Sequence, residues 1–129
     1  MFRAKTVLVI GAGASVEVGL PMGTDLLKQI VKLTHITFEH YRQKTGDYNI
    51  IEALKLYLNE GGEVIQLNEH LRASWQLSES AKQAISIDNV IDALEDSKVE
   101  IMGKLGIVRA ILQAESDSPL FKFVENRYN

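Results

Sequence analysis

The sequence predicts an α/β fold in which one buried strand is followed by a predominantly helical chain, and three observations lead to that prediction. Residues 7–10, V-L-V-I, form an apolar run without alternation, which is typical of a strand buried on both faces of a parallel sheet. Gly11 stops this run and allows a tight turn into a helix. From residue 47 onward, apolar side chains recur at helical spacing almost throughout.

The bulk composition is that of one ordinary globular domain. The chain has 129 residues, of which 46% are hydrophobic and 24% charged, and its net charge is -3. This charge gives no reason to expect a nucleic-acid partner, and no apolar run reaches the ~20 residues that would span a bilayer. Residues 7–10 are too short for the apolar part of a secretion signal, so we expect a cytoplasmic protein without a membrane partner.

No metal site is expected. The chain has no cysteine, which excludes disulfides and cysteine-ligated metals. The three histidines, His35, His40 and His70, lack the spacing of metal ligands, so we interpret them as surface or boundary residues.

Helical stripes and turn signals divide the rest of the chain. Residues 26–31 predict a helix that Thr24 or Asp25 caps. Ile36 and Phe38 alternate as in a short strand before a break at residues 45–47. Four later helices are indicated by the following stripes: Ile50, Ile51, Leu54 and Leu58; Val64, Leu67, Leu71 and Trp75; Ile87, Val90, Ile91 and Leu94; and Ile101, Leu105, Val108 and Leu112.

Signals for helix starts accompany the later stripes. The helix of residues 87–94 is expected to begin near Ser86. Residues 97–100, S-K-V-E, form a capping box that opens the longest helix. Residues 118–119, S-P, open the last one, because proline is tolerated at the first helical position.

This pattern leaves the sheet incomplete within the chain. A strand buried on both faces needs neighbours that accept its backbone hydrogen bonds, and the sequence supplies one strand or two. Two alternatives are open. The missing strands belong to the remainder of a longer chain, which we favour, or a partner chain, as in a homo-oligomer, completes the sheet.

The glycine turn after residue 10 has the chemistry of a phosphate site with a Rossmann-like start. Gly13 lets a pyrophosphate approach the backbone, and Ser15 lies at the helix start, where free N–H groups favour an anion. The full G-x-G-x-x-G fingerprint would need glycine where Val16 stands, and Glu39 is the nearest candidate for its acidic residue. A purely structural turn between strand and helix is the alternative interpretation.

The longer string G-A-G-A-S-V-E-V-G-L-P, from Gly11 to Pro21, resembles the opening motif of sirtuins and sirtuin-like domains. Residues 86–91, S-I-D-N-V-I, are similar to a segment of bacterial sirtuin-like domains, several of which are NAD hydrolases in anti-phage defence. The resemblance implies that residues 1–129 are the N-terminal part of a single sirtuin-like NAD-binding domain. It implies NAD as ligand or substrate, with these cofactor-binding residues: Gly11, Ala12, Gly13, Ser15, Gly19 and Pro21.

Departures from the family pattern limit what the resemblance implies. Residues 22–24, M-G-T, follow Pro21 where sirtuin deacylases have Asp-Phe-Arg, and the four-cysteine zinc ribbon is missing. Neither the family's asparagine motif nor its catalytic histidine is found, so the catalytic residues are unassigned. The complete module is expected to be an NAD hydrolase. The alternatives are a non-catalytic nucleotide- or protein-binding module, or a fragment of a flavin- or nicotinamide-dependent oxidoreductase.

Overall fold

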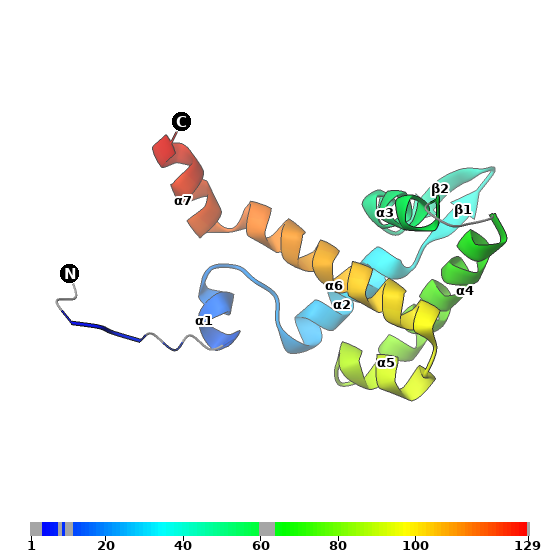
Figure 1. Ribbon diagram of the computed structural model, residues 1–129, viewed down its shortest axis with the longest axis horizontal. Coiled ribbons are helices and arrows are strands. Elements are labelled where there is room, and N and C mark those ends of the chain that lie inside the picture. Colours follow the sequence, from blue (N-terminus) through cyan, green and yellow to red (C-terminus); the bar gives the residue numbers. More distant parts are fainter. Residues whose placement is uncertain (1–3, 8, 10–11, 60–63, 129) are drawn as a thin grey trace.

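The computed structural model describes residues 4–7, 9, 12–59 and 64–128, which form a predominantly helical structure with one two-stranded antiparallel sheet (Figure 1). The prediction of a largely helical chain is therefore confirmed. The elements in chain order are α1 (Ala12–Glu17), α2 (Gly23–Thr34), β1 (Thr37–Glu39), β2 (Arg42–Thr45), α3 (Tyr48–Asn59), α4 (Val64–Ala81), α5 (Ile87–Leu94), α6 (Ser97–Asp117) and α7 (Pro119–Tyr128).

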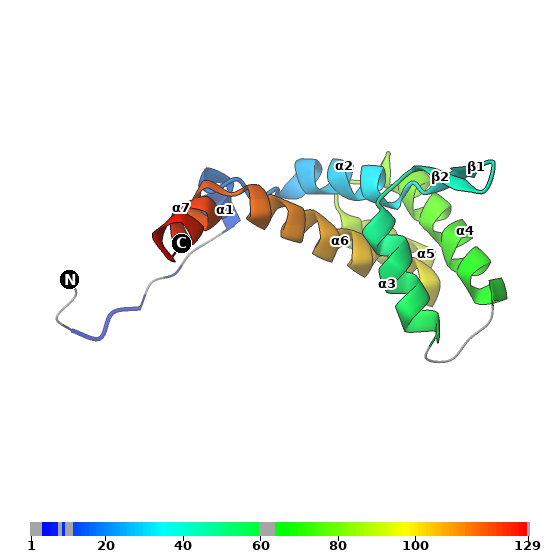
Figure 2. The ribbon, with the colours of Figure 1, turned by 90° about the horizontal axis from the view of Figure 1, so that it is seen from above.

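The long helix α6 organises the molecule. It runs through the structure, with α2 to α5 and the hairpin around its first half and with α1 and α7 at its far end (Figures 1 and 2). Helices α2, α4 and α6 pack against one another in pairs and carry most of the core. None of the helices in the described ranges combines the length and apolarity needed to cross a bilayer.

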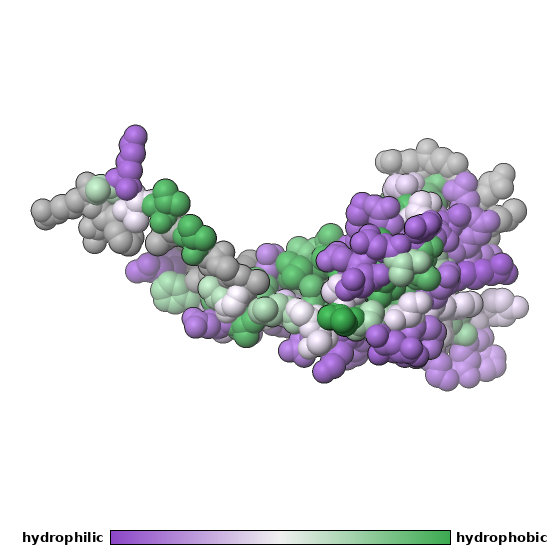
Figure 3. Space-filling view, turned by 90° about the horizontal axis from the view of Figure 1, so that it is seen from below, coloured by the Kyte–Doolittle hydropathy of each residue, from purple (hydrophilic) through white to green (hydrophobic). Residues whose placement is uncertain are grey.

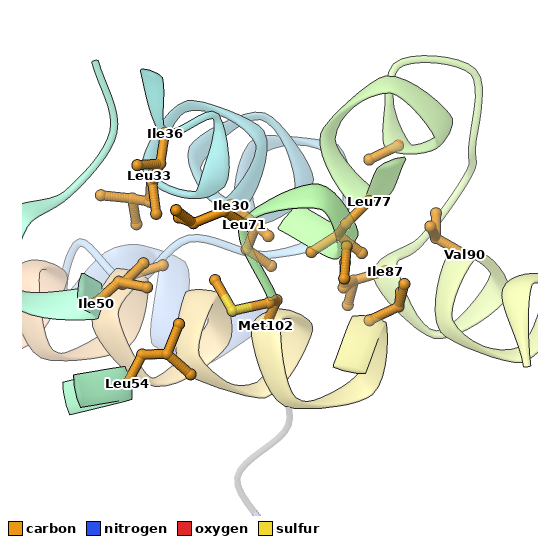
Figure 4. Packing of buried hydrophobic residues seen from close by; sticks show 14 of the residues in the cluster. Ile30, Leu33, Ile36, Ile50, Leu54, Leu71, Leu77, Ile87, Val90 and Met102 are labelled. Atoms are coloured by element: carbon orange, nitrogen blue, oxygen red, sulfur yellow. The ribbon is translucent and has the colours of Figure 1, made fainter. Parts of the chain in front are cut away.

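The core is one cluster of aliphatic side chains from α2 to α6 (Figure 4). Ile30 of α2, Leu54 of α3, Leu77 of α4 and Met102 of α6 are completely buried in it. The predicted stripe of α3 is confirmed, since its four members are all buried. Helix α5 begins after Ser86 as predicted, and the Ser86 hydroxyl accepts a hydrogen bond from the backbone N–H of residue 89.

Helix α6 buries a different face from the predicted one. The sequence favoured Ile101, Leu105, Val108 and Leu112, but Val108 is 55% exposed and Leu112 is 52% exposed. The buried residues are instead Val99, Met102, Gly103, Gly106, Ala110 and Ala114. The physical reason is the close approach of α2: a Cβ at Gly106 would lie 2.9 Å from methyl groups of both Ile30 and Thr34.

Two predicted helix caps lie at other residues. Asp96 caps α6, because its Oδ1 accepts a hydrogen bond of 2.8 Å from the Lys98 N–H, so the predicted capping box is wrong by one position. Helix α2 begins at Gly23, and neither Thr24 nor Asp25 caps it. Both side chains lie within its first turn, since the extended residue Met22 occupies the N-cap position.

The end of α2 is joined to the hairpin and to α4 through its last carbonyl groups. The Thr34 carbonyl accepts a hydrogen bond from Ser74 Oγ, and the next carbonyl accepts one of 2.6 Å from Thr45 Oγ1. The Ile36 carbonyl accepts one from Trp75 Nε1. These bonds supply donors to carbonyl groups at and just after the C-terminal end of α2, which have no partner within the helix. Trp75, predicted to be core, is therefore partly exposed and anchored by its indole nitrogen.

Asp47 connects α3 with α6. Its Oδ1 accepts hydrogen bonds from the Ile50 N–H (3.2 Å) and from Arg109 Nε (3.0 Å). The carboxylate therefore both caps α3 and forms a largely buried ion pair that ties the start of α3 to α6.

The apolar run before α1 is not a buried strand in the residues that the structure describes. Val7 is 86% exposed and Val9 is 93% exposed, and neither belongs to a strand, so the prediction of burial is wrong for both. Leu8 and Ile10 lie outside the described residues. The reason is the missing neighbour: β1 and β2 pair with each other, and no described strand lies beside residues 7 and 9.

Candidate functional site

Helix α1 begins within the glycine motif. Its first residue is Ala12, so that Gly13 and Ser15 lie in its first turn. Gly11 lies outside the described residues. A Cβ at Gly13 would meet no atom within 4 Å, so this position faces open space. Ser15 is half-buried.

The G-L-P part of the motif ends α1. Gly19 has φ +86°, the left-handed conformation that glycine adopts at little cost. Its N–H donates to the Val16 carbonyl (2.9 Å), and the Leu20 N–H donates to the Ser15 carbonyl (3.0 Å). These two bonds form a Schellman motif, and Pro21 follows where the helix cannot continue. Gly19 and Pro21, predicted from the resemblance as cofactor-binding residues, thus have a local structural role in ending α1.

The turn after α1 is held by residues about a hundred positions further along the chain. Ser118 Oγ donates a hydrogen bond of 2.6 Å to the Val18 carbonyl, and Pro119 Cδ would lie 3.8 Å from a Cβ at Gly19. Ser118 is buried in this contact. As a result, the turn after α1 is held against the junction of α6 and α7 (Figures 1 and 2).

A groove opens between this turn and α2. It consists of two adjoining hollows of about 470 and 340 Å³, which share Gly19 and Gln29 in their walls. We call it the glycine groove, and the residues that define it are Val16, Gly19, Leu20, Pro21, Asp25, Lys28, Gln29, Lys32, Leu33, Gln113, Ala114 and Asp117. Gly19 and Pro21 therefore line the groove, whereas Gly13 and Ser15 do not.

The α2 wall of the glycine groove carries the cationic side chains. Lys28 and Lys32 are one helical turn apart and so project from the same face. The Lys28 ammonium lies 3.9 Å from an oxygen of Asp25, with both side chains largely exposed, which makes this a weak pair. Sequence reasoning missed both lysines and Gln29, because a polar helix surface has no spacing that separates ligand-binding residues from solvated ones.

None of the three histidines lines the glycine groove. His70, expected at the surface or its boundary, is buried in α4, and its Nδ1 bonds with the Gln66 carbonyl at 2.6 Å. His35 Nδ1 bonds with Ser78 Oγ at 3.2 Å, and His40 lies exposed in the hairpin turn. Within the described ranges, no group of three or more acidic or histidine side chains could hold a metal ion.

No protein-family model, curated protein or solved structure matches this chain. Function is therefore inferred from its own residues and geometry.

Proposed function

We propose that this chain binds the phosphates of NAD, or of a related ADP-ribose nucleotide, as the N-terminal part of a sirtuin-like module. The observation that supports this proposal most is the composition of the glycine groove. The turn of the sirtuin-like motif at Gly19 and the two lysines of α2, Lys28 and Lys32, line the same groove.

The chemistry of the groove suits a pyrophosphate. Each lysine ammonium offers three N–H donors and a full positive charge, and Gln29 adds a neutral amide donor. In this proposal the start remains Rossmann-like, because residues 7–10 would form a strand wherever another segment supplies hydrogen-bonding neighbours.

Cleavage of the nicotinamide–ribose bond by the complete module is the second part of the proposal, and it rests on the resemblance, as does a role in anti-phage defence. Such cleavage needs a positioned water and usually a base within hydrogen-bond reach. No histidine lines the glycine groove among the described residues. That observation favours the alternative of a non-catalytic nucleotide-binding module for the chain taken alone.

Thermal unfolding with and without NAD or ADP-ribose tests the proposal. At about 100 times its dissociation constant a ligand adds roughly 2.7 kcal/mol to the free energy of unfolding, and the melting temperature rises accordingly. Lys28→Ala and Lys32→Ala are expected to reduce the rise. Lys55→Ala is the matched control, because Lys55 and Lys28 each pair with an acidic residue three positions earlier on an exposed helix face.

A substitution at Gly13 tests whether the phosphates lie in the groove or at the first turn of α1. A Cβ at Gly13 meets no described atom, so Gly13→Val is expected to fold, and it is expected to keep the ligand-induced rise because Gly13 does not line the glycine groove. The proposal fails if millimolar nucleotide stabilises neither the parent chain nor any variant. It also fails if Lys55→Ala lowers the response as much as Lys28→Ala does.

A further inference from the structure

The outward face of α6 carries a stripe of large apolar side chains, two of which the fold leaves more than half exposed. We call it the α6 seam, defined by Ile101, Leu105, Val108 and Leu112. Val108 and Leu112 are more than half exposed, and Ile101 and Leu105 are half-buried. In the space-filling view, apolar residues gather along the middle of the molecule between the N-terminal segment and the polar bundle (Figure 3). Two large apolar side chains exposed one helical turn apart on one face make this side of α6 a candidate interaction surface.

The core covers only part of this stripe, because α6 packs mainly through its other side; of the seam residues, Leu105 also packs against the core. Gly106, which contacts α2, and Val108 are two residues apart, which places them about 160° apart around the helix. Gly103, which contacts Ile91 and Leu77, lies on the inner side as well. Asp47, just before α3, forms an ion pair with Arg109 of α6, and Arg109 lies about 100° from Val108 around the helix.

The spacing of the seam matches a helix pair. Its members are separated by four, three and four residues, which is the a and d spacing of a coiled coil. A face with this spacing is complementary to itself, as a twofold interface requires. We propose that the α6 seam binds the α6 seam of a second copy of this chain, with the two helices antiparallel.

The apolar layers follow from this antiparallel register. Ile101 lies opposite Leu112 of the second copy, and Leu105 lies opposite Val108 of the second copy. The twofold axis passes between positions 106 and 107, and each of the two contacts occurs twice, so the pair has four apolar layers along a helix of 21 residues. Such an interface is small, and the dimer is therefore weak and dependent on concentration.

Charge at the ends of the seam selects the antiparallel direction. The same register places Lys98 opposite Glu115 of the second copy at both ends. A parallel pair would instead bring Lys98 against Lys98 and Glu115 against Glu115, which is unfavourable. Glu115 is exposed and Lys98 is partly exposed, so both side chains are accessible to a second copy. Within its own chain, the Lys98 ammonium lies 3.5 Å from a Glu69 oxygen. Antiparallel helices also align their dipoles favourably.

The pairing leaves the glycine groove accessible. Gln113 and Asp117 line that groove on the α2 side of α6, away from Val108 and Leu112. Pairing through the seam and nucleotide binding are therefore independent proposals about different faces of one helix.

Sedimentation equilibrium between micromolar and millimolar concentrations tests the pairing. The parent chain is expected to pass from monomer to dimer over this range, and Val108→Glu is expected to stay monomeric. Ile85→Glu is the control, because Ile85 is an aliphatic residue that is 83% exposed between α4 and α5, away from the seam. Far-ultraviolet circular dichroism checks that both variants fold. A parent chain that stays monomeric throughout, or an equal loss with Ile85→Glu, overturns the proposal.

Single cysteines test the direction, since the chain has none of its own. Ile101→Cys and Leu112→Cys proteins are mixed and oxidised. An antiparallel pair gives predominantly the mixed disulfide, because those positions face each other across the interface. Disulfides of each variant with itself, or no crosslink between folded variants, contradict the antiparallel seam.

Discussion

Replacing Gly106 by alanine tests the close packing that defines this fold. The added Cβ would lie 2.9 Å from the Ile30 Cγ2 methyl and 2.9 Å from the Thr34 Cγ2 methyl, whereas ordinary contacts begin at 3.4 Å. Neither methyl has room to move, because both residues are completely buried and the Thr34 hydroxyl is held by the Ile30 carbonyl at 2.8 Å.

The expected magnitude follows from two opposing effects. Overpacking a well-packed core costs about 1–3 kcal/mol. Alanine is favoured over glycine within a helix by about 1 kcal/mol, which offsets part of this cost. We therefore expect Gly106→Ala to lower the free energy of unfolding by about 1 kcal/mol, and the melting temperature by about 3–5 °C for a chain of this length.

Urea unfolding followed by circular dichroism measures this loss as a lower midpoint at an unchanged slope. Gly13→Ala is the control, since its Cβ would meet no atom within 4 Å and it should not destabilise the chain. Gly103→Ala should cost less than Gly106→Ala, because its nearest neighbour is the flexible end of Ile91. A Gly106→Ala variant as stable as the parent chain would refute the packing of α2 on α6 described above.

Three further predictions concern polar contacts. Asp47→Ala should lower the free energy of unfolding by about 3 kcal/mol in urea titrations, because it removes a helix cap and leaves the partly buried Arg109 unpaired; an unchanged midpoint would contradict this. Trp75→Phe should cost about 1 kcal/mol by the same measurement, through loss of the indole hydrogen bond, and no loss would show the bond to be dispensable. The hydrogen bond from Lys82 holds the pKa of Glu79 below its usual value, so the contribution of this pair to the stability of the fold is present at neutral pH and is lost as the pH falls through that lowered pKa. Lys82→Gln should return the pKa of Glu79 toward its usual value in an NMR titration. An unaltered titration of Glu79 would exclude the pair.

The elements that were predicted correctly depend on local sequence patterns. The stripe of α3 and the start of α5 after Ser86 were both predicted, because periodic burial and an N-cap hydroxyl are properties of neighbouring residues. The alternation of Ile36 and Phe38 predicted one short strand of the hairpin, and Phe38 lies in β1. Ile36 itself lies in the core just before β1.

The face of α6 could not be predicted in the same way. Hydrophobicity favours Val108 and Leu112 as the buried residues, whereas the structure uses Gly106 because α2 approaches too closely for a larger side chain. That approach depends on residues some seventy positions earlier in the chain. The stripe that the sequence marks as buried instead forms the α6 seam, two of whose residues are more than half exposed.

The candidate site was predicted in part. The resemblance pointed to Gly19 and Pro21, and both line the glycine groove, where they also end α1. Lys28 and Lys32 could not be selected, since their place in the groove beside Gly19 depends on how the turn after α1 leads into α2. The buried strand at Val7 and Val9 was predicted from its composition alone, which contains no information about whether a neighbouring strand is present.

The central claim is that a nucleotide phosphate binds in the glycine groove. Titration of isotope-labelled protein with ADP-ribose, followed by two-dimensional NMR of the backbone amides, tests it most directly. We expect saturable shifts in residues 16–20 of the motif and residues 28–33 of α2, with the amides of α5 unchanged. Absence of shifts at millimolar ADP-ribose, or shifts confined to the acidic hollow between α5 and α6 that Asp92 and Glu100 line, would contradict the proposed function.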